Sequence, residues 1–238
     1  MYKITSILMA VLSSLPVYAD KSKDEHYTDA GFFDIHVCNW PDRPPFYLAL
    51  LSTERFDEVE SVRIEDGDGE HVGDIGFDVV RKIRRKNKPE KRVFISHFPV
   101  TGDAQDGWFQ AEIVLENGER YTAKDYVTHQ LLGRAQGLTP GHTPGGGAEV
   151  DTVPTRLQWD AIEGAGYYQV FIRDKWQADK LIHSSKLIKT NYYGLPEGLL
   201  EEGGYYAWKV HARDVNEDIK LGDFNLGSQS EWVEFMIE

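Results

Sequence analysis

Short runs of β-branched and aromatic residues constrain the fold of this chain more than any other feature. Each run ends at glycine, proline, asparagine or aspartate, which is the usual alternation of strands and turns. Neither half of the chain has a long helical pattern. The chain is therefore predicted to be all-β. The strands expected in its first half are Phe32–Cys38, Phe46–Ser52, Val59–Ile64, Val93–Phe98, Trp108–Leu115 and Arg120–Tyr126.

The clearest single hairpin signal is Asn117-Gly118, which separates the last two of these runs. A type I′ turn needs positive φ at both central residues, and this dipeptide supplies it readily. Alternation in the preceding run indicates an antiparallel sheet with one buried face. The residues expected on that face are Phe109, Ala111, Ile113 and Leu115.

A glycine- and proline-rich window divides the chain. Residues 133–154 contain six glycines and three prolines and few large apolar side chains. Such a composition favours a flexible or extended linker with no packed element. We therefore expect a domain at 20–132, a linker at 133–152 and a second domain at 153–238. The strand content and length of the first domain predict an immunoglobulin-like β-sandwich.

The second domain has a more specific order of features. Leu157-Gln158-Trp159 begins a short strand, Tyr167–Arg173 follows it, and Tyr205–Asp214 and Ser228–Phe235 come last. In this order, the stretch from about Pro154 to Phe235 resembles a fibronectin type III domain, particularly the divergent bacterial members. The resemblance implies a second β-sandwich with Trp159 as its large core aromatic.

Alternation along Tyr205–Asp214 predicts which side chains point inward. Tyr206, Trp208, Val210 and Ala212 share one face, whereas Lys209, His211 and Arg213 share the opposite face, which we expect to be solvated. The resemblance also implies a tyrosine corner, filled by Tyr205 or Tyr206. The preceding segment is longer than the usual tight turn of the family, so the choice between the two stays open.

The first nineteen residues have the pattern of a secretory signal peptide. Lys3 provides a positive start, Ile4–Leu15 is apolar, and Val17-Tyr18-Ala19 suits a signal peptidase. We expect cleavage after Ala19 and a periplasmic or secreted protein without a transmembrane segment. The single cysteine, Cys38, excludes an internal disulfide, which fits a bacterial envelope better than a eukaryotic secretory pathway.

The charge of the chain is strongly acidic, with a formal value of −13, and this argues against a nucleic-acid partner. One segment departs from it: Arg81–Arg92 holds eight cations and one anion. It could dock an anionic polymer, a lipid headgroup or the protein's own acidic surface, or it could be a solvated hairpin. The candidate residues are Arg81, Lys82, Arg84 and Arg85. The overlapping stretch Phe77–Lys86 is compatible with a helix or a strand.

Motifs of nucleophilic, zinc-dependent and nucleotide-binding enzymes were not found, and no cofactor is predicted. Two acidic loops have calcium-like spacing, Asp66–Glu70 and Asp214–Asp218. The first is also a simple hairpin turn. The second lacks the glycine and the bidentate glutamate of an EF-hand.

Aromatic residues beside polar ones mark a further candidate site. Trp176, Tyr192 and Tyr193 are expected to be partly exposed and to contact a sugar or a protein. The sequence thus favours an exported, non-catalytic binding, adhesion or scaffold protein of the bacterial envelope. Its partner would be an envelope protein, a host protein or a polysaccharide. The alternatives are a hydrolase or enzyme-accessory subunit and a purely architectural component.

Overall fold

The computed structural model describes residues 24–100, 104–143, 148–214 and 224–238, and these residues form strands and connecting segments without any helix. Consequently, none of the described residues forms a helix that could span a membrane. The all-β prediction is confirmed. The predicted leader, residues 1–19, lies outside the described residues.

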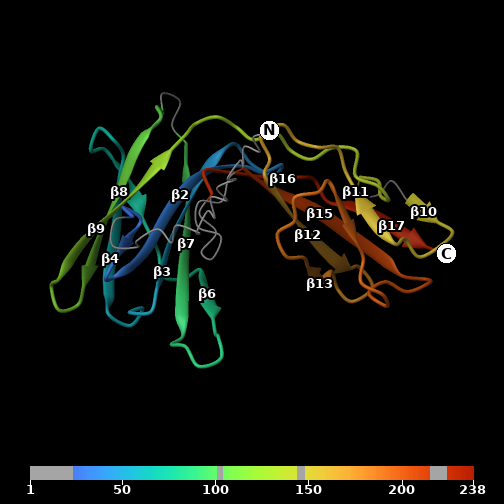
Figure 1. Cartoon of the computed structure of the whole chain (residues 1–238), viewed down its shortest axis with the longest axis horizontal. Helices are drawn as coiled ribbons and strands as arrows, with labels where there is room; N and C mark the ends of the chain where they lie inside the picture. The colour runs from blue at the N-terminus through green and yellow to red at the C-terminus, as the bar shows by residue number, and fades with distance from the viewer. Residues whose placement is uncertain (1–23, 101–103, 144–147, 215–223) are drawn as a thin grey trace, which may run out of the picture.

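The first sandwich is built from two facing sheets (Figure 1). One has the order β2-β3-β7-β6, with β1 beside β2, and the other has the order β5-β4-β8-β9. All six strands expected in this half are present. The strands are β1 (Tyr27–Thr28), β2 (Gly31–Asn39), β3 (Phe46–Thr53), β4 (Val59–Glu65), β5 (His71–Asp74), β6 (Val80–Ile83), β7 (Lys91–Pro99), β8 (Gly107–Leu115) and β9 (Arg120–Val127).

The β8–β9 hairpin confirms the expected pairing, whereas the expected turn type is wrong. The amide of Gly118 donates to the carbonyl of Leu115 at 2.8 Å, and the amide of Leu115 donates to the carbonyl of Glu119 at 2.9 Å. Only Gly118 has positive φ, at 84°. This is a type I turn followed by a glycine bulge, because the loop is one residue longer than a type I′ turn allows. The predicted inward face, Phe109 to Leu115, is buried.

The ambiguous stretch Phe77–Lys86 contains a strand, so the helical alternative is wrong. β6 pairs with β7, with Val80 opposite Phe94 and Arg81 opposite Val93. Phe77 packs edge-on against Phe94, with ring centroids 4.8 Å apart. Tertiary pairing therefore overrides the weak helical spacing of this segment.

The second sandwich packs the small β11–β14 sheet against a larger one (Figure 1). In the larger sheet, β15 pairs with β12 on one side and with β16 and β17 on the other. Trp159 and Trp208 lie in its core with ring centroids 6.2 Å apart. The strands are β10 (Ala148–Val150), β11 (Arg156–Gln158), β12 (Tyr167–Asp174), β13 (Lys180–Ser184), β14 (Tyr192–Gly194), β15 (Tyr205–Arg213), β16 (Leu226–Gln229) and β17 (Val233–Ile237).

The two tyrosines at the start of β15 have different roles. The hydroxyl of Tyr206 accepts a hydrogen bond from the amide of Glu201 at 3.0 Å, which ties the preceding loop to the sheet. The hydroxyl of Tyr205 instead donates to the carboxylate of Glu234. Tyr206 therefore has the geometry expected of a tyrosine corner.

Residues 133–143 and 148–152 pack along the second sandwich, so the expectation that this segment forms no packed element is wrong. β10 pairs in parallel with β17, and His142 exchanges backbone hydrogen bonds with Glu234 at 3.0 and 2.8 Å. The indole Nε1 of Trp208 donates to the carbonyl of Pro140 at 2.6 Å. Backbone pairing of this kind needs few large apolar side chains, which is why composition alone misjudged the segment.

The two sandwiches share one continuous sheet. β16 pairs in parallel with β2, with Leu226 opposite Val37 and Gly227 opposite Cys38. Beside this ladder, the hydroxyl of Ser228 donates to the carbonyl of Gly133 at 2.7 Å. The predicted solvated face of β15 is therefore covered near its end: His211 is only 7% exposed, because the first sandwich lies against it.

Gly141→Ala is expected to destabilise the protein by about 1–3 kcal/mol. A Cβ at Gly141 would lie 2.6 Å from Cγ2 of Val233, and φ there is +147°. Urea unfolding monitored by tryptophan fluorescence measures the effect. Gly194→Ala is the control, because no atom lies within 4 Å of the added Cβ and φ is not in the restricted region. Equal stabilities of the two variants would mean that the segment is an unpacked linker.

Candidate functional site: a groove between the two sandwiches

A groove of about 350 Å³ lies on the shared sheet where the two sandwiches meet. Side chains of β2, β3, β6 and β7 line it from the first sandwich, and those of β12 and β15 line it from the second. Figure 1 shows these strands on either side of the junction at β16. Its volume is near the lower end of the range for ligand pockets.

The floor of the groove is aliphatic. Leu50 of β3 lies directly opposite Ile95 of β7, and Val93 of β7 lies opposite Arg81 of β6. These side chains project from the sheet face that points away from the core of the first sandwich. The aliphatic lining residues of the first sandwich are Leu48, Leu50, Ile83, Val93 and Ile95.

The charged side chains that line the groove are all basic. They are Arg81, Arg85 and Lys91 from the β6–β7 hairpin and Arg213 from β15. The guanidinium of Arg213 donates to Oε1 of Gln169 at 3.2 Å and lies 4.9 Å from the ring centroid of Phe224. Burial lowers the pKa of Arg213 to about 10; the charge of Asp34 opposes this shift, and the like charge of Arg81 adds to it. Arg81 of the first sandwich therefore acts on the charge of Arg213 in the second.

Two histidines, His36 and His211, line the groove, one from each sandwich. A Cβ built on Gly227 would lie 3.3 Å from Nε2 of His211 and 3.7 Å from the ring of His36. The missing side chain of Gly227 therefore lets both rings lie beside the strand that joins the sandwiches. Nε2 of His211 is buried and has no hydrogen-bond partner in the part of the chain that the structure describes.

The pKa values of the two rings are shifted in opposite directions. Burial lowers the pKa of His36, but the carboxylate of Asp34, at 2.9 Å from Nδ1, overrides it and places the pKa well above its usual value. Burial also lowers the pKa of His211, and the charges of Arg213 and His36 lower it further. The pKa values of the two rings therefore lie on opposite sides of the ordinary histidine value.

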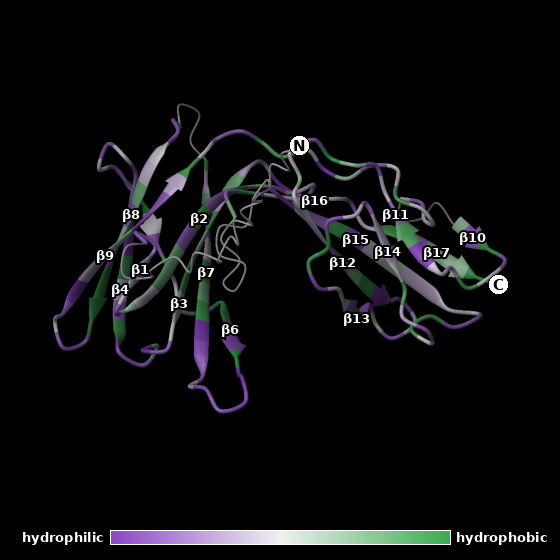
Figure 2. Cartoon of the chain, viewed as in Figure 1, coloured by the Kyte–Doolittle hydropathy of each residue, from purple (hydrophilic) through white to green (hydrophobic). Residues whose placement is uncertain are grey.

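The predicted basic run is divided between two faces by the alternation of β6. Arg81 and Arg85 line the groove, whereas Lys82 lies opposite Arg92 on the other face. Arg84 forms an ion pair with Glu90 at 2.6 Å. Arg81 and Arg85 form no ion pair with any described residue. Figure 2 shows β6 and the adjoining hairpin as a hydrophilic end of the first sandwich.

The predicted aromatic residues lie elsewhere, on the second sandwich. Trp176, in the turn after β12, is 65% exposed, and its indole nitrogen donates to the carbonyl of Gly203 at 3.1 Å. Tyr192 and Tyr193 belong to β14 of the smaller sheet. Tyr192 is exposed, and the hydroxyl of Tyr193 contacts Nε2 of His183 at 2.8 Å. None of the three lines the groove.

The acidic loop Asp66–Glu70 is organised by its own backbone. Oδ1 of Asp66 accepts hydrogen bonds from the amides of Asp68 and Glu70, both at 3.0 Å. This is the hairpin turn that the sequence offered as the alternative to calcium. No cluster of three metal-ligating side chains occurs among the described residues. Most of the second loop, Asp214–Asp218, lies outside them.

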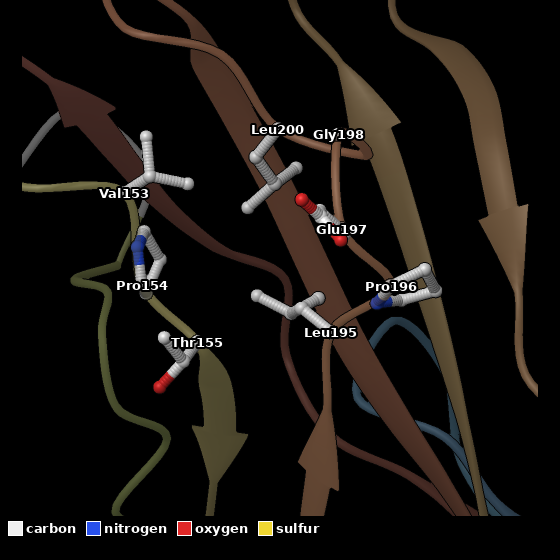
Figure 3. A pocket seen from close by; sticks show the side chains of 8 residues that line it. All are labelled: Val153, Pro154, Thr155, Leu195, Pro196, Glu197, Gly198 and Leu200. Carbon is white, nitrogen blue, oxygen red and sulfur yellow. The ribbon is translucent and has the colours of Figure 1, made fainter.

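A second hollow, of about 330 Å³, opens at the far end of the second sandwich. Val153 and Pro154 line one side of it, and Leu195 and Leu200 line the other (Figure 3). Its only charged lining residue is Glu197. The hollow provides apolar contact and few polar groups, so it carries less chemical specificity than the groove.

Sequence reasoning missed His36, His211 and Arg213 as groove residues, whereas Lys91 belongs to the predicted basic segment Arg81–Arg92. All three have polar side chains at strand positions, which ordinarily indicates a solvated face. The sequence therefore shows that these side chains share a face of their strands. It does not show that this face is covered by the other sandwich, because the β16–β2 pairing leaves no local signal in the sequence.

The described residues thus form two β-sandwiches that share a sheet.

No family model and no curated protein matches the sequence. Among solved structures, the chain is similar to a crystal structure of domains A168–A170 from titin. That match has a TM-score of 0.29 and 14% identity and covers 87% of this chain and 66% of that one. It is also similar to a crystal structure of DIP-gamma IG1+IG2, with a TM-score of 0.22 and 11% identity over 89% of this chain and 99% of that one.

The two histidines are expected to give the stability of the protein opposite pH dependences on either side of pH 6.5, the ordinary histidine pKa. Below it, unfolded His211 binds a proton that folded His211 does not bind, so stability falls as the pH falls. Above it, folded His36 retains a proton that unfolded His36 loses, so stability falls as the pH rises through the pKa of folded His36.

Urea unfolding between pH 5.5 and 9 measures both slopes, each worth at most about 1.4 kcal/mol per pH unit for one proton. His211→Gln is expected to reduce the acid slope and to leave the alkaline slope unchanged. Burial also lowers the pKa of His97 and of His183, so part of the acid slope remains. An unchanged acid slope in His211→Gln would contradict the assignment.

Proposed function

We propose that the chain is an exported, non-catalytic binding or scaffold protein that holds an anionic ligand in the groove between its sandwiches. One observation carries the proposal: in a chain with a net charge of −13, none of the side chains lining the groove is acidic, and four are lysine or arginine. Concentrated positive charge of this kind attracts and orients an anion.

The arrangement of the cations supports the same conclusion. Arg81 and Arg213 come from different sandwiches, and the charge of Arg81 raises the electrostatic cost of the charge on Arg213, an effect that the charge of Asp34 opposes. A carboxylate, sulfate or phosphate between them would replace this repulsion by two charge-assisted hydrogen bonds.

Export and the fibronectin type III assignment form part of the same proposal. The pattern of residues 1–19 supports secretion into the periplasm or the medium of a bacterium. The buried Trp159 and the hydrogen bond to the hydroxyl of Tyr206 support a fibronectin type III-like second sandwich beside an immunoglobulin-like first one. The exposed Trp176 remains a candidate contact for a protein or polysaccharide of the envelope or of a host.

The basic hairpin has cations that line the groove and cations that do not, so two double variants can remove the same charge from different places. Arg81→Ala/Arg85→Ala removes two groove cations, whereas Lys82→Ala/Arg84→Ala removes two cations that do not line the groove. Thermal unfolding of both variants is measured against a panel of carboxylates, sulfates and phosphates at low millimolar concentration. We expect anions to raise the Tm of the wild type and of the second variant, and to have little effect on the first.

Both variants change exposed residues, so their stabilities without anions are expected to differ from that of the wild type by less than about 0.5 kcal/mol. Equal anion responses of the two variants would remove the groove as the binding site.

A further inference from the structure

We propose that the ligand of the groove is a single-chain anionic amphiphile, with its head group between Arg81 and Arg213 and its apolar chain over Leu50 and Ile95. The proposal rests on the proposed function, since it names the chemical class of the anion held in the same groove. It follows from two features of the groove: its aliphatic floor and the arginines that line it from both sandwiches.

The floor is more apolar than an ionic ligand requires. Leu48, Leu50 and Ile95 are only half-buried, although they lie in the middle of a sheet that runs through both sandwiches. A small inorganic anion would leave these side chains against water. An alkyl chain would cover them, and each methylene group that it buries tightens binding about fourfold.

The head-group position is set by groups from both sandwiches. Arg81 and Arg213 face the groove from opposite sides, and neither pairs with a described carboxylate. The carboxylate of Asp34 is hydrogen-bonded to His36 and does not line the groove. Oxygen atoms of a carboxylate, sulfate or phosphate would accept hydrogen bonds from both guanidinium groups.

The ring of His211 also lines the groove. Its Nε2 is fully buried beside Gly227, so a ligand in the groove would contact the rest of the ring and not this atom. The hydrogen bonds to the head group therefore come from the two guanidinium groups. An amphiphile therefore satisfies the polar end and the apolar floor of the groove together.

A charged polymer is a poorer occupant. Only Arg81, Arg85 and Lys91 of the basic hairpin line the groove, whereas Lys82 and Arg84 do not. A polyanion would bind the exposed cations on both faces of the hairpin, with a steep salt dependence. Binding of an amphiphile would depend only on the cations of the hairpin face that lines the groove.

Isothermal titration calorimetry of the full chain tests the proposal with three probes: octyl sulfate below its micelle-forming concentration, inorganic sulfate and octyl glucoside. We expect one octyl sulfate per chain, bound at least tenfold more tightly than either other probe. The affinity is expected to rise from hexyl to octyl to decyl sulfate.

Single-residue variants test which side chains contact the sulfate group of octyl sulfate and which contact its alkyl chain. Arg81→Ala is expected to weaken octyl sulfate binding about tenfold or more, and Lys82→Ala, on the other face of the same hairpin, is the control expected to have little effect. Leu50→Thr, at a half-buried strand position, is expected to weaken octyl sulfate and to leave the affinity for inorganic sulfate unchanged.

The outcomes separate this proposal from the proposed function. If sulfate and the alkyl sulfates bind equally and all depend on Arg81, the groove binds anions and the amphiphile is wrong. Equal binding of octyl glucoside and octyl sulfate would overturn the role of the head group. An affinity that does not change with chain length would overturn the role of the floor, even if Leu50→Thr fails to fold. If no anion binds, both proposals fail.

Discussion

The parallel pairing of β16 with β2 is the interaction on which the groove depends. It joins the two sandwiches through their backbones, with Gly227 opposite Cys38 in the centre of the ladder. Two sandwiches joined by a chain alone would each expose the outer face of their sheets to water. The shared sheet instead places the outer face of β15 beside that of β2, so that His211 of the second sandwich and His36 of the first lie against the same glycine.

The charge of the groove follows from the two-residue period of a strand. A basic run on a helix or an irregular loop would present its cations in many directions. On β6, alternation directs Arg81 and Ile83 to one face and Lys82 to the other. A run that is uniformly basic in sequence therefore has two distinct faces in the fold. One face joins an aliphatic floor, and the other lies beside Arg92 at the edge of the sandwich. Local positive charge thus exists inside a strongly acidic protein.

Much of the fold could be predicted from the sequence, because strands and hairpins leave local signals. Alternation located the strands of the first sandwich, and Asn117-Gly118 located the β8–β9 hairpin. The core position of Trp208 followed from alternation, and that of Trp159 from the resemblance to fibronectin type III domains. The packing of Gly141 and Pro140 did not, because close backbone approach selects glycine as readily as flexibility does. Of the candidate site, only the basic hairpin could be predicted. Its partners His211 and Arg213 lie more than 110 residues beyond the end of β7 at Pro99 and reach it only through the β16–β2 ladder.

The residues of the junction are poorly suited to stability alone, and this favours a ligand. A joint between two sheets is most stable when apolar side chains fill it, because a buried polar group without a partner costs about 1–3 kcal/mol. Here His211 has such a nitrogen, and burial and the charge of Arg81 disfavour the charge of Arg213, whereas the charge of Asp34 favours it. Local violations of stability concentrate at binding and catalytic sites, where the offsetting interaction comes from the ligand. An anion between Arg81 and Arg213 would offset the cost of the charge on Arg213, so ligand binding and the joining of the two sandwiches are linked through these two arginines.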